Sequence, residues 1–262
     1  MTLKKFSQSE INLAFKRLTR SLTRGKTIST QPKAILLGGQ SGAGKTTLHR
    51  MKQKEFQGNI IIIDVNSYQS LHPNYLNLQK EFGKESVHYT KKFAGKMVEL
   101  LIEELSKQSY HLLIEGTLRT TAVPRETAQL LKSLGYEVSL ALIATKPELS
   151  YLSTLIRYEE LYRIDPTNAR ATPMEHHDEI VKNLPMRLKE LENDQIFKRI
   201  QIYQRDKHCV YDSAIDDASA VEILKECLFG QWSEVENEML RLSSDRLREL
   251  TCGNDRSIDT SK

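Results

Sequence analysis

The stretch that most constrains this chain is residues 34–47, an apolar run that breaks into glycines and ends on Lys-Thr-Thr. Residues 39–46 fit the pattern G-x-x-x-x-G-K-[ST], and a helix-compatible segment follows directly. Glycines permit backbone dihedrals that a Cβ would forbid, so successive N–H groups can turn towards a phosphate at the positive end of the next helix. The pattern predicts a strand, a phosphate-binding loop and a helix that bind a nucleoside triphosphate.

Two side chains of this loop add chemistry to that of its backbone. Lys45 places a cation where the β- and γ-phosphate oxygens gain negative charge, and the Thr46 hydroxyl is a suitable ligand for the Mg²⁺ that bridges them. The predicted cofactors are therefore ATP and Mg²⁺. The predicted ATP-binding residues are Gly39, Gln40, Ser41, Gly42, Ala43, Gly44, Lys45, Thr46 and Thr47.

The composition is that of an ordinary globular protein of 262 residues with 39% hydrophobic side chains. Its 38 basic and 34 acidic residues leave a net charge of +4, too even a balance to predict nucleic acid or a membrane as a partner. The apolar runs are far shorter than a membrane span, and the N-terminus lacks the apolar core of a signal peptide. We therefore expect a cytoplasmic protein with reduced cysteines.

Strand-like and helix-like segments alternate over the first 144 residues. Ser7 and Glu10 form a capping-box pattern before an amphipathic segment, which predicts a helix that either packs on the sheet or docks a partner. After the phosphate loop, strands are predicted at 58–64, 111–116 and 136–144, with helices within 81–107 and 124–134. This order predicts an α/β fold with a doubly wound parallel sheet, like that of P-loop kinases.

Helical patterns dominate residues 145–199 and predict a lid inserted into the nucleotide fold. Within this region Pro147 suits a first helical turn, and Thr172 with Glu175 resembles a second capping box. Strands at 199–203 and 209–211 would complete the sheet. We expect one kinase domain over residues 1–231, whose segment 1–30 is helical, and then a charged helix with a frayed tail over residues 232–262.

Polar residues at the carboxyl ends of the predicted strands are candidates for the acceptor side, because ligands of open α/β sheets lie there. Asp64 and Asn66 follow one strand, and Glu115 ends another as a Walker B acid would, near Mg²⁺ or an attacking hydroxyl. Arg157 and Arg170 lie on the predicted lid. Lid arginines stabilise charge on a transferring phosphate, although surface salt bridges explain them equally well.

The chain resembles the zeta toxins, the toxic kinases of type II toxin–antitoxin pairs, over residues 7–215. The resemblance rests on residues 37–46, 71–74, 114–121, 156–160 and 169–173. It implies ATP-dependent phosphorylation of a hydroxyl of UDP-N-acetylglucosamine, which inhibits cell-wall synthesis. It also implies a cognate antitoxin partner that packs near the nucleotide site, with segment 1–30 as the expected contact.

The same resemblance implies roles for individual residues. Lys45, residue 66, Arg157 and Arg170 would be catalytic. Glu99, Glu115, Thr117, Arg119 and Thr127 would line the pocket for the amino-sugar nucleotide.

The chain departs from the family at residue 66, where Asn66 replaces the aspartate that takes the proton from the acceptor hydroxyl. An amide cannot remove that proton at neutral pH, and a positioned base contributes about 10²–10⁴-fold. Asp64 and Glu115 are the nearby carboxylates that could substitute. Three interpretations stay open: a working or impaired UDP-N-acetylglucosamine kinase, a degenerate toxin that binds without catalysis, or a P-loop kinase for another small hydroxylated substrate.

Overall fold

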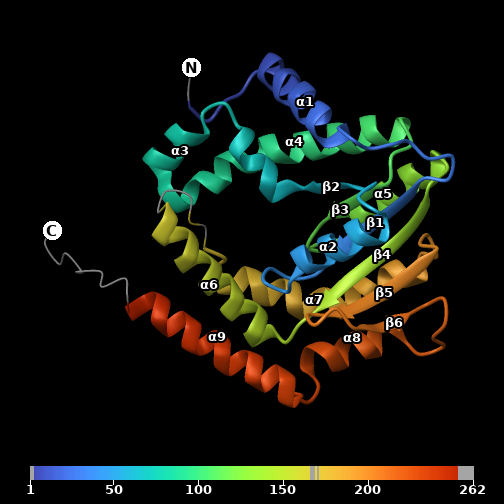
Figure 1. Ribbon diagram of the computed structural model, residues 1–262, viewed down its shortest axis with the longest axis vertical. Coiled ribbons are helices and arrows are strands. Elements are labelled where there is room, and N and C mark those ends of the chain that lie inside the picture. Colours follow the sequence, from blue (N-terminus) through green and yellow to red (C-terminus); the bar gives the residue numbers. More distant parts are fainter. Residues whose placement is uncertain (1–2, 166–168, 170, 253–262) are drawn as a thin grey trace, which may run out of the picture.

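The computed structural model describes residues 3–165, 169 and 171–252, and within them one sheet of six strands forms the centre of the molecule (Figure 1). The strands lie in the order β2-β3-β1-β4-β5-β6. The first five are mutually parallel, and β6 pairs antiparallel with β5. Their bounds are β1 Lys33–Gly38, β2 Ile61–Asp64, β3 Leu112–Glu115, β4 Glu137–Ala144, β5 Arg199–Gln204 and β6 Cys209–Asp212.

Helices connect the strands and cover the sheet, which confirms the predicted α/β fold. They are α1 Gln8–Thr23, α2 Lys45–Glu55, α3 Tyr75–Phe82, α4 Ser86–Lys107, α5 Ala122–Ser133, α6 Pro147–Ile164, α7 Met174–Asn193, α8 Ala220–Phe229 and α9 Glu234–Cys252, with short 3-10 helices η1 Val65–Leu71 and η2 Gly83–Glu85. Across the described part of the chain, no helix combines the length and the apolar character that crossing a membrane requires.

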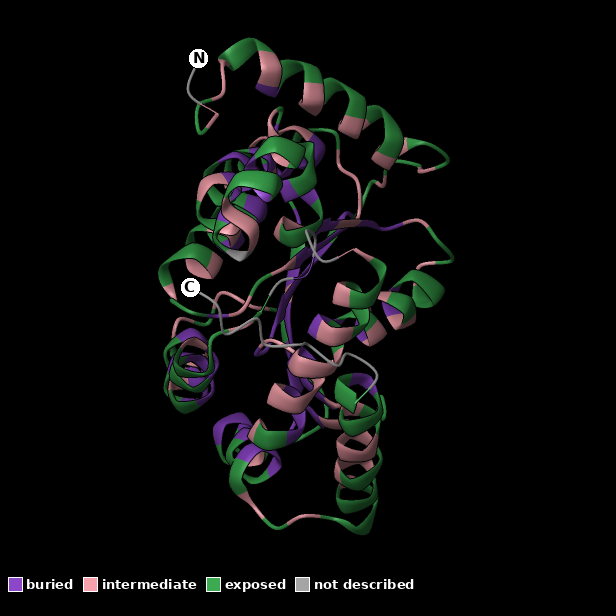
Figure 2. Ribbon diagram, turned by 90° about the vertical axis from the view of Figure 1, so that its left-hand side faces the viewer, coloured by how far each residue is buried: buried purple, intermediate pink, exposed green. Residues whose placement is uncertain are grey.

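Side chains of β1 alternate between two hydrophobic clusters on opposite faces of the sheet, as a strand buried on both faces requires. Ile35 and Leu37 pack in the smaller cluster with Leu48 of α2. Ala34 and Leu36 belong to the larger cluster, to which α4, α5, α7 and α8 contribute. Figure 2 shows the strands as the most buried layer, with the exposed faces of the helices outside them. The sheet therefore holds the end of β1, and the loop after it, in a fixed place.

The capping box predicted before α1 is present. Ser7 is the N-cap: its hydroxyl accepts from the N–H of Glu10 at 3.3 Å, and its own N–H donates to the Glu10 carboxylate at 2.7 Å. Ile11 is buried, and the Phe6 ring packs edge-on to Phe93 of α4 with centroids 5.3 Å apart. One face of α1 therefore packs on the body of the fold, while its other face is exposed (Figure 2).

The capping box predicted at Thr172 and Glu175 is wrong. Helix α7 begins at Met174 with Pro173 as its N-cap, and no side chain caps it. The Thr172 hydroxyl instead lies 3.3 Å from the hydroxyl of Ser41 in the phosphate loop. The Thr172 hydroxyl therefore contacts the phosphate loop instead of capping α7 as the local sequence pattern predicts. Pro147 does occupy the first turn of α6 as predicted.

Helix α9 is the helix expected after residue 231, and it packs along α6 (Figure 1). The Arg163 guanidinium of α6 donates to the backbone oxygen of Leu250 at 2.7 Å, and Arg246 pairs with Glu160 at 3.1 Å. The tail predicted beyond it, residues 253–262, lies outside the described residues. The C-terminal helix is thus joined to the helix that carries Arg157.

Candidate active site

The loop between β1 and α2 has the backbone that its glycine pattern predicts. Gly39, Gly42 and Gly44 have φ angles of 140°, 76° and 105°. A Cβ at Gly42 would also lie 2.0 Å from the carbonyl oxygen of Ser150 on α6, so close packing as well as dihedral angle requires glycine there. Gly44 is the N-cap of α2 and offers no side-chain cap. The first N–H groups of α2 are therefore available to an anion.

Lys45 is buried at the base of this loop. Its ammonium donates to the backbone oxygens of Gly39 at 2.9 Å and Gln40 at 3.1 Å, and it lies 3.8 Å from the carboxylate of Glu115. Burial lowers the pKa of Lys45, Glu115 opposes that shift, and the charge of Arg157 adds to it. The loop therefore holds a desolvated cation, which interacts more strongly with a phosphate than an exposed one does.

Glu115 ends β3 and lies between two basic groups. Its Oε1 faces the Lys45 ammonium, and its Oε2 lies 2.8 Å from Nε2 of His49. Burial raises the pKa of Glu115, but the nearby His49 and the Lys45 charge outweigh burial and hold the pKa below its usual range. Sequence reasoning missed His49. The available signal was its spacing, because residues i and i+4 of one helix share a face, and Lys45 and His49 both lie on α2.

Asn66 follows the strand, as the sequence predicts, and lies in the first turn of a 3-10 helix. β2 ends at Asp64 and η1 begins at Val65. The Asp64 carboxylate caps η1, accepting from the N–H of Asn66 at 2.9 Å and from the hydroxyl of Ser67 at 2.8 Å. A local turn thus engages both oxygens of Asp64, while Asn66 borders the cavity described below.

Two arginines contact the phosphate loop. Arg157 of α6, predicted from the sequence, donates to the hydroxyl of Ser41 at 3.4 Å. Arg205 follows β5 and was not predicted; it donates to the hydroxyl of Ser153 at 2.6 Å and to the backbone oxygen of Gly42 at 3.4 Å, and burial lowers its pKa. No sequence motif surrounds Arg205 that would predict phosphate binding, and the fold alone places it beside the phosphate loop. Arg170 lies outside the described residues.

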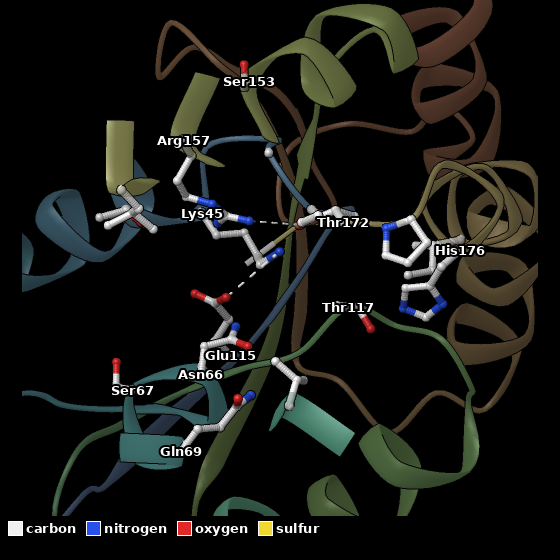
Figure 3. Close-up of a pocket in the computed structure, with 18 of the residues that line it drawn as sticks. Lys45, Asn66, Ser67, Gln69, Glu115, Thr117, Ser153, Arg157, Thr172 and His176 are labelled. Carbon is white, nitrogen blue, oxygen red and sulfur yellow. Dashed lines mark hydrogen bonds and ion pairs between the residues drawn. The ribbon is translucent and has the colours of Figure 1, made fainter. Parts of the chain in front are cut away.

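A cavity of about 780 Å³ lies between the phosphate loop and the ends of β2 and β3. Figure 3 shows Lys45 and Arg157 on one side, Asn66 and Gln69 on the other, and Glu115 between them. The described residues that line it are Ser41, Gly42, Gly44, Lys45, Thr46, Asn66, Ser67, Gln69, Ser70, Tyr75, Val87, Glu115, Thr117, Ser153, Arg157, Leu161, Ala171, Thr172, Pro173, His176 and Ile180. The cavity thus has cations next to the phosphate loop, and one carboxylate with several neutral polar groups at the ends of β2 and β3.

Three residues predicted to line the acceptor pocket lie outside this cavity. Glu99 is exposed on α4 and pairs with Lys96 at 3.0 Å. Arg119 is half exposed and lies 3.6 Å from Glu179 of α7. Thr127 lies on α5, away from the cavity lining. Their role in acceptor binding stays a prediction, whereas Glu115 and Thr117 do line the cavity.

Comparison with known proteins decides the family. The family model described as "Zeta toxin" matches residues 19–216, which is most of the chain. This chain belongs to the zeta toxin family. It is 65% identical over 250 residues to Toxin PezT of Streptococcus pneumoniae serotype 4 (strain ATCC BAA-334 / TIGR4), covering 95% of this chain and 99% of that protein. It is 43% identical over 192 residues to Toxin zeta of Streptococcus pyogenes, covering 73% and 67% of the two chains.

Solved structures agree with this membership. A structure from the PezAT chromosomal toxin–antitoxin system of Streptococcus pneumoniae aligns with a TM-score of 0.90 at 63% identity, covering 95% of this chain and all of that one. A chain of the AvrRxo1-ORF1:-ORF2 complex aligns with a TM-score of 0.62 at 16% identity, covering 94% and 82%. The second likeness shows that the fold is shared. The zeta-type fold is thus established for this chain.

Proposed function

We propose that this chain is a cytoplasmic kinase that transfers the γ-phosphate of ATP to a hydroxyl of UDP-N-acetylglucosamine, and thereby inhibits cell-wall synthesis. The observation that carries the kinase activity is one cavity with a phosphate loop and two cations at one end and Asn66, Glu115 and Thr117 at the other. Family membership supports the choice of acceptor, because the motifs shared with zeta toxins include residues 114–121.

Each end of the cavity has a separate task. The open N–H groups of α2 and the Lys45 ammonium would hold the β- and γ-phosphates, and Arg157 would stabilise charge on the phosphate that is transferred. The Thr46 hydroxyl lines the same cavity, which fits a ligand of nucleotide-bound Mg²⁺. When bound, Mg²⁺ neutralises part of the charge on the β- and γ-oxygens. The acceptor hydroxyl would enter from the side of Asn66 and Thr117.

The amide of Asn66 supports a second candidate, a degenerate toxin that binds ATP and antitoxin with little turnover. A third candidate is a kinase for another small hydroxylated substrate, since the phosphate loop specifies the donor and leaves the acceptor open. Incubating UDP-N-acetylglucosamine with ATP, Mg²⁺ and the purified protein, and weighing the products by mass spectrometry, separates all three.

The expected product is UDP-N-acetylglucosamine that carries one added phosphoryl group. Lys45→Ala is the negative control, and Asn66→Asp is the gain-of-function control because aspartate restores a carboxylate of nearly equal shape. Product from neither the parent nor Asn66→Asp would overturn the choice of acceptor. Product from Asn66→Asp alone would support the degenerate toxin.

We also propose a cognate antitoxin as the partner. The support is that Toxin PezT and the structure from the PezAT system are relatives from a toxin–antitoxin pair and align with nearly the whole chain. The exposed face of α1 is the proposed contact.

A further inference from the structure

Transfer to the acceptor hydroxyl requires a general base that takes its proton, and the amide of Asn66 cannot act as one. Among the described residues that line the cavity, Glu115 is the single carboxylate. Asp64, the other carboxylate at this edge of the sheet, is outside the lining, and both of its oxygens accept hydrogen bonds within the turn that starts η1. The fold therefore separates two acids that look equivalent in the sequence.

Glu115 is held in one orientation by contacts on both of its oxygens. Oε2 lies 2.8 Å from His49 Nε2, while Oε1 faces the Lys45 ammonium at 3.8 Å. Lys45 belongs to the loop that takes the β- and γ-phosphates, so Oε1 is the oxygen on the phosphate side of the cavity. The Asp64 and Glu115 backbones are register partners in β2 and β3, which places Glu115 beside the start of η1 and hence beside Asn66. Figure 3 shows Asn66 next to Glu115.

We propose that Glu115, oriented by His49, is the general base of this chain and takes the place of the missing carboxylate at residue 66. The inference rests on the proposed kinase function. In the step, the acceptor O–H bond breaks as its oxygen bonds to the γ-phosphorus, and the proton passes to Glu115 Oε1. The bond between the γ-phosphorus and the bridging oxygen breaks, and ADP leaves with that electron pair.

The surroundings of Glu115 suit this role. His49 and Lys45 keep the carboxylate ionised at neutral pH although it is buried, so it starts the step as an acceptor. His49 is a positioning residue: its Nε2 lies 2.8 Å from Oε2, which leaves Oε1 directed at the site of transfer. The Asn66 amide can donate a hydrogen bond to the acceptor oxygen and orient it without taking the proton.

The decisive experiment measures the effect of Glu115→Gln in two backgrounds, the Asn66 parent and Asn66→Asp. Glutamine keeps the shape of the side chain and an oxygen for the contact with His49 but cannot accept the proton. We expect kcat for phosphorylation of UDP-N-acetylglucosamine to fall by about 100-fold or more in the parent, within the range that a general base contributes. In Asn66→Asp, which has its own base, we expect a fall of less than about tenfold.

A second readout separates catalysis from binding. Calorimetry with UDP-N-acetylglucosamine, in the presence of a non-hydrolysable ATP analogue, should give a Kd for Glu115→Gln within about threefold of the parent. Equal losses of kcat in both backgrounds, or a loss that appears in the Kd alone, would overturn the proposal and make Glu115 a substrate ligand. Measurable turnover by Asn66→Asp with none by the parent would also overturn it and would support the degenerate toxin; turnover by neither removes both the proposal and the choice of acceptor.

His49 is tested in the Asn66 parent with three variants. His49→Leu removes the ring nitrogen that contacts Glu115, so kcat should fall while KM for ATP stays within about threefold. His49→Gln restores a side-chain nitrogen and should recover most of the loss. His88→Gln, at an exposed histidine of α4, is the matched control and should behave as the parent does. Equal activity of His49→Leu and the parent would refute the positioning role.

Discussion

At the scale of the residue, Lys45 shows how the fold prepares a charge for its ligand. Its ammonium is buried and hydrogen-bonded to backbone oxygens of its own loop. A phosphate can replace those oxygens with full negative charge in a site of low dielectric, which makes the exchange favourable. The role of Lys45 is therefore to bind the donor, independently of what residue 66 does to the acceptor.

Lys45→Ala should abolish most of the stabilisation that ATP gives. We expect ATP with Mg²⁺ to raise the Tm of the parent, because a ligand that binds the folded state alone stabilises it by mass action. The shift should be much smaller for Lys45→Ala, measured by calorimetry at equal ligand concentration. Lys80→Ala, at an exposed lysine of α3, is the control and should shift as the parent does. The same shift in all three proteins would contradict the assignment.

His72 gives a residue-scale prediction about pH. Its ring is buried between Phe6 and Phe93, and its Nδ1 accepts from the N–H of Asn74 at 3.1 Å. Burial lowers its pKa below the ordinary value of 6.5, although Glu10 opposes the shift. The unfolded chain therefore binds more protons just below pH 6.5, and the free energy of unfolding decreases as the pH falls through that window.

His72→Asn should weaken this pH dependence, because asparagine can still accept from the Asn74 N–H but does not titrate. Urea unfolding at pH 7 and pH 5 gives the two free energies. We expect the parent to lose more stability on acidification than His72→Asn, by at most about 1.4 kcal/mol per pH unit. His88→Asn, at an exposed position, should keep the slope of the parent. Identical slopes for parent and His72→Asn would contradict a buried neutral His72.

At the scale of the element, helices α6 and α7 of the predicted lid are tied to the phosphate loop by a buried polar chain. His177 of α7 lies 2.8 Å from the hydroxyl of Ser150 on α6, and the Gln40 amide of the loop donates to that hydroxyl at 3.3 Å and to the backbone oxygen of Thr145 at 2.6 Å. All three side chains are buried. The first turns of α6 and α7 are thus hydrogen-bonded to each other and, through Gln40, to the phosphate loop.

Helix α1 should carry part of the antitoxin interface on its exposed face. Leu13 and Arg17 are exposed there, whereas Ile11 anchors the opposite face. The double variant Leu13→Glu with Arg17→Glu should weaken antitoxin binding about tenfold or more, a loss of about 1.4 kcal/mol, with Tm nearly unchanged. Calorimetry with the cognate antitoxin measures this, and Lys132→Glu on α5 is the control. Unchanged affinity would leave α1 with packing as its role.

At the scale of the whole molecule, α9 belongs to the same folding unit as the site. It packs on α6, and Leu250 is its buried residue. Leu250→Ala should reduce the free energy of unfolding by about 2 kcal/mol or more, the range for deleting buried methyl groups, within a single unfolding transition. Leu242→Ala removes the same atoms at an exposed position and should cost less than about 0.5 kcal/mol. If both variants reduced the free energy of unfolding by equally small amounts, α9 would not be part of the cooperative folding unit.

Much of this architecture is determined by local pattern. The glycines and Lys45 specify the phosphate loop because the motif needs its neighbours alone, and the apolar runs specify buried parallel strands because both faces of such strands are covered. Ser7 and Glu10 predict the start of α1 for the same reason, since a capping box is complete within four residues.

Only the tertiary structure decided which polar side chains meet. His49 of α2 meets Glu115 of β3, and Arg205 after β5 reaches the backbone oxygen of Gly42, although no local pattern relates these segments. Asp64 and Glu115 both end strands of the same sheet. Yet the Asp64 carboxylate accepts a hydrogen bond within the next turn, whereas Glu115 lines the cavity. Thr172 reads as a helix cap but faces Ser41. Sequence patterns report what a segment does by itself, whereas a site is made of side chains that distant segments bring within hydrogen-bond distance.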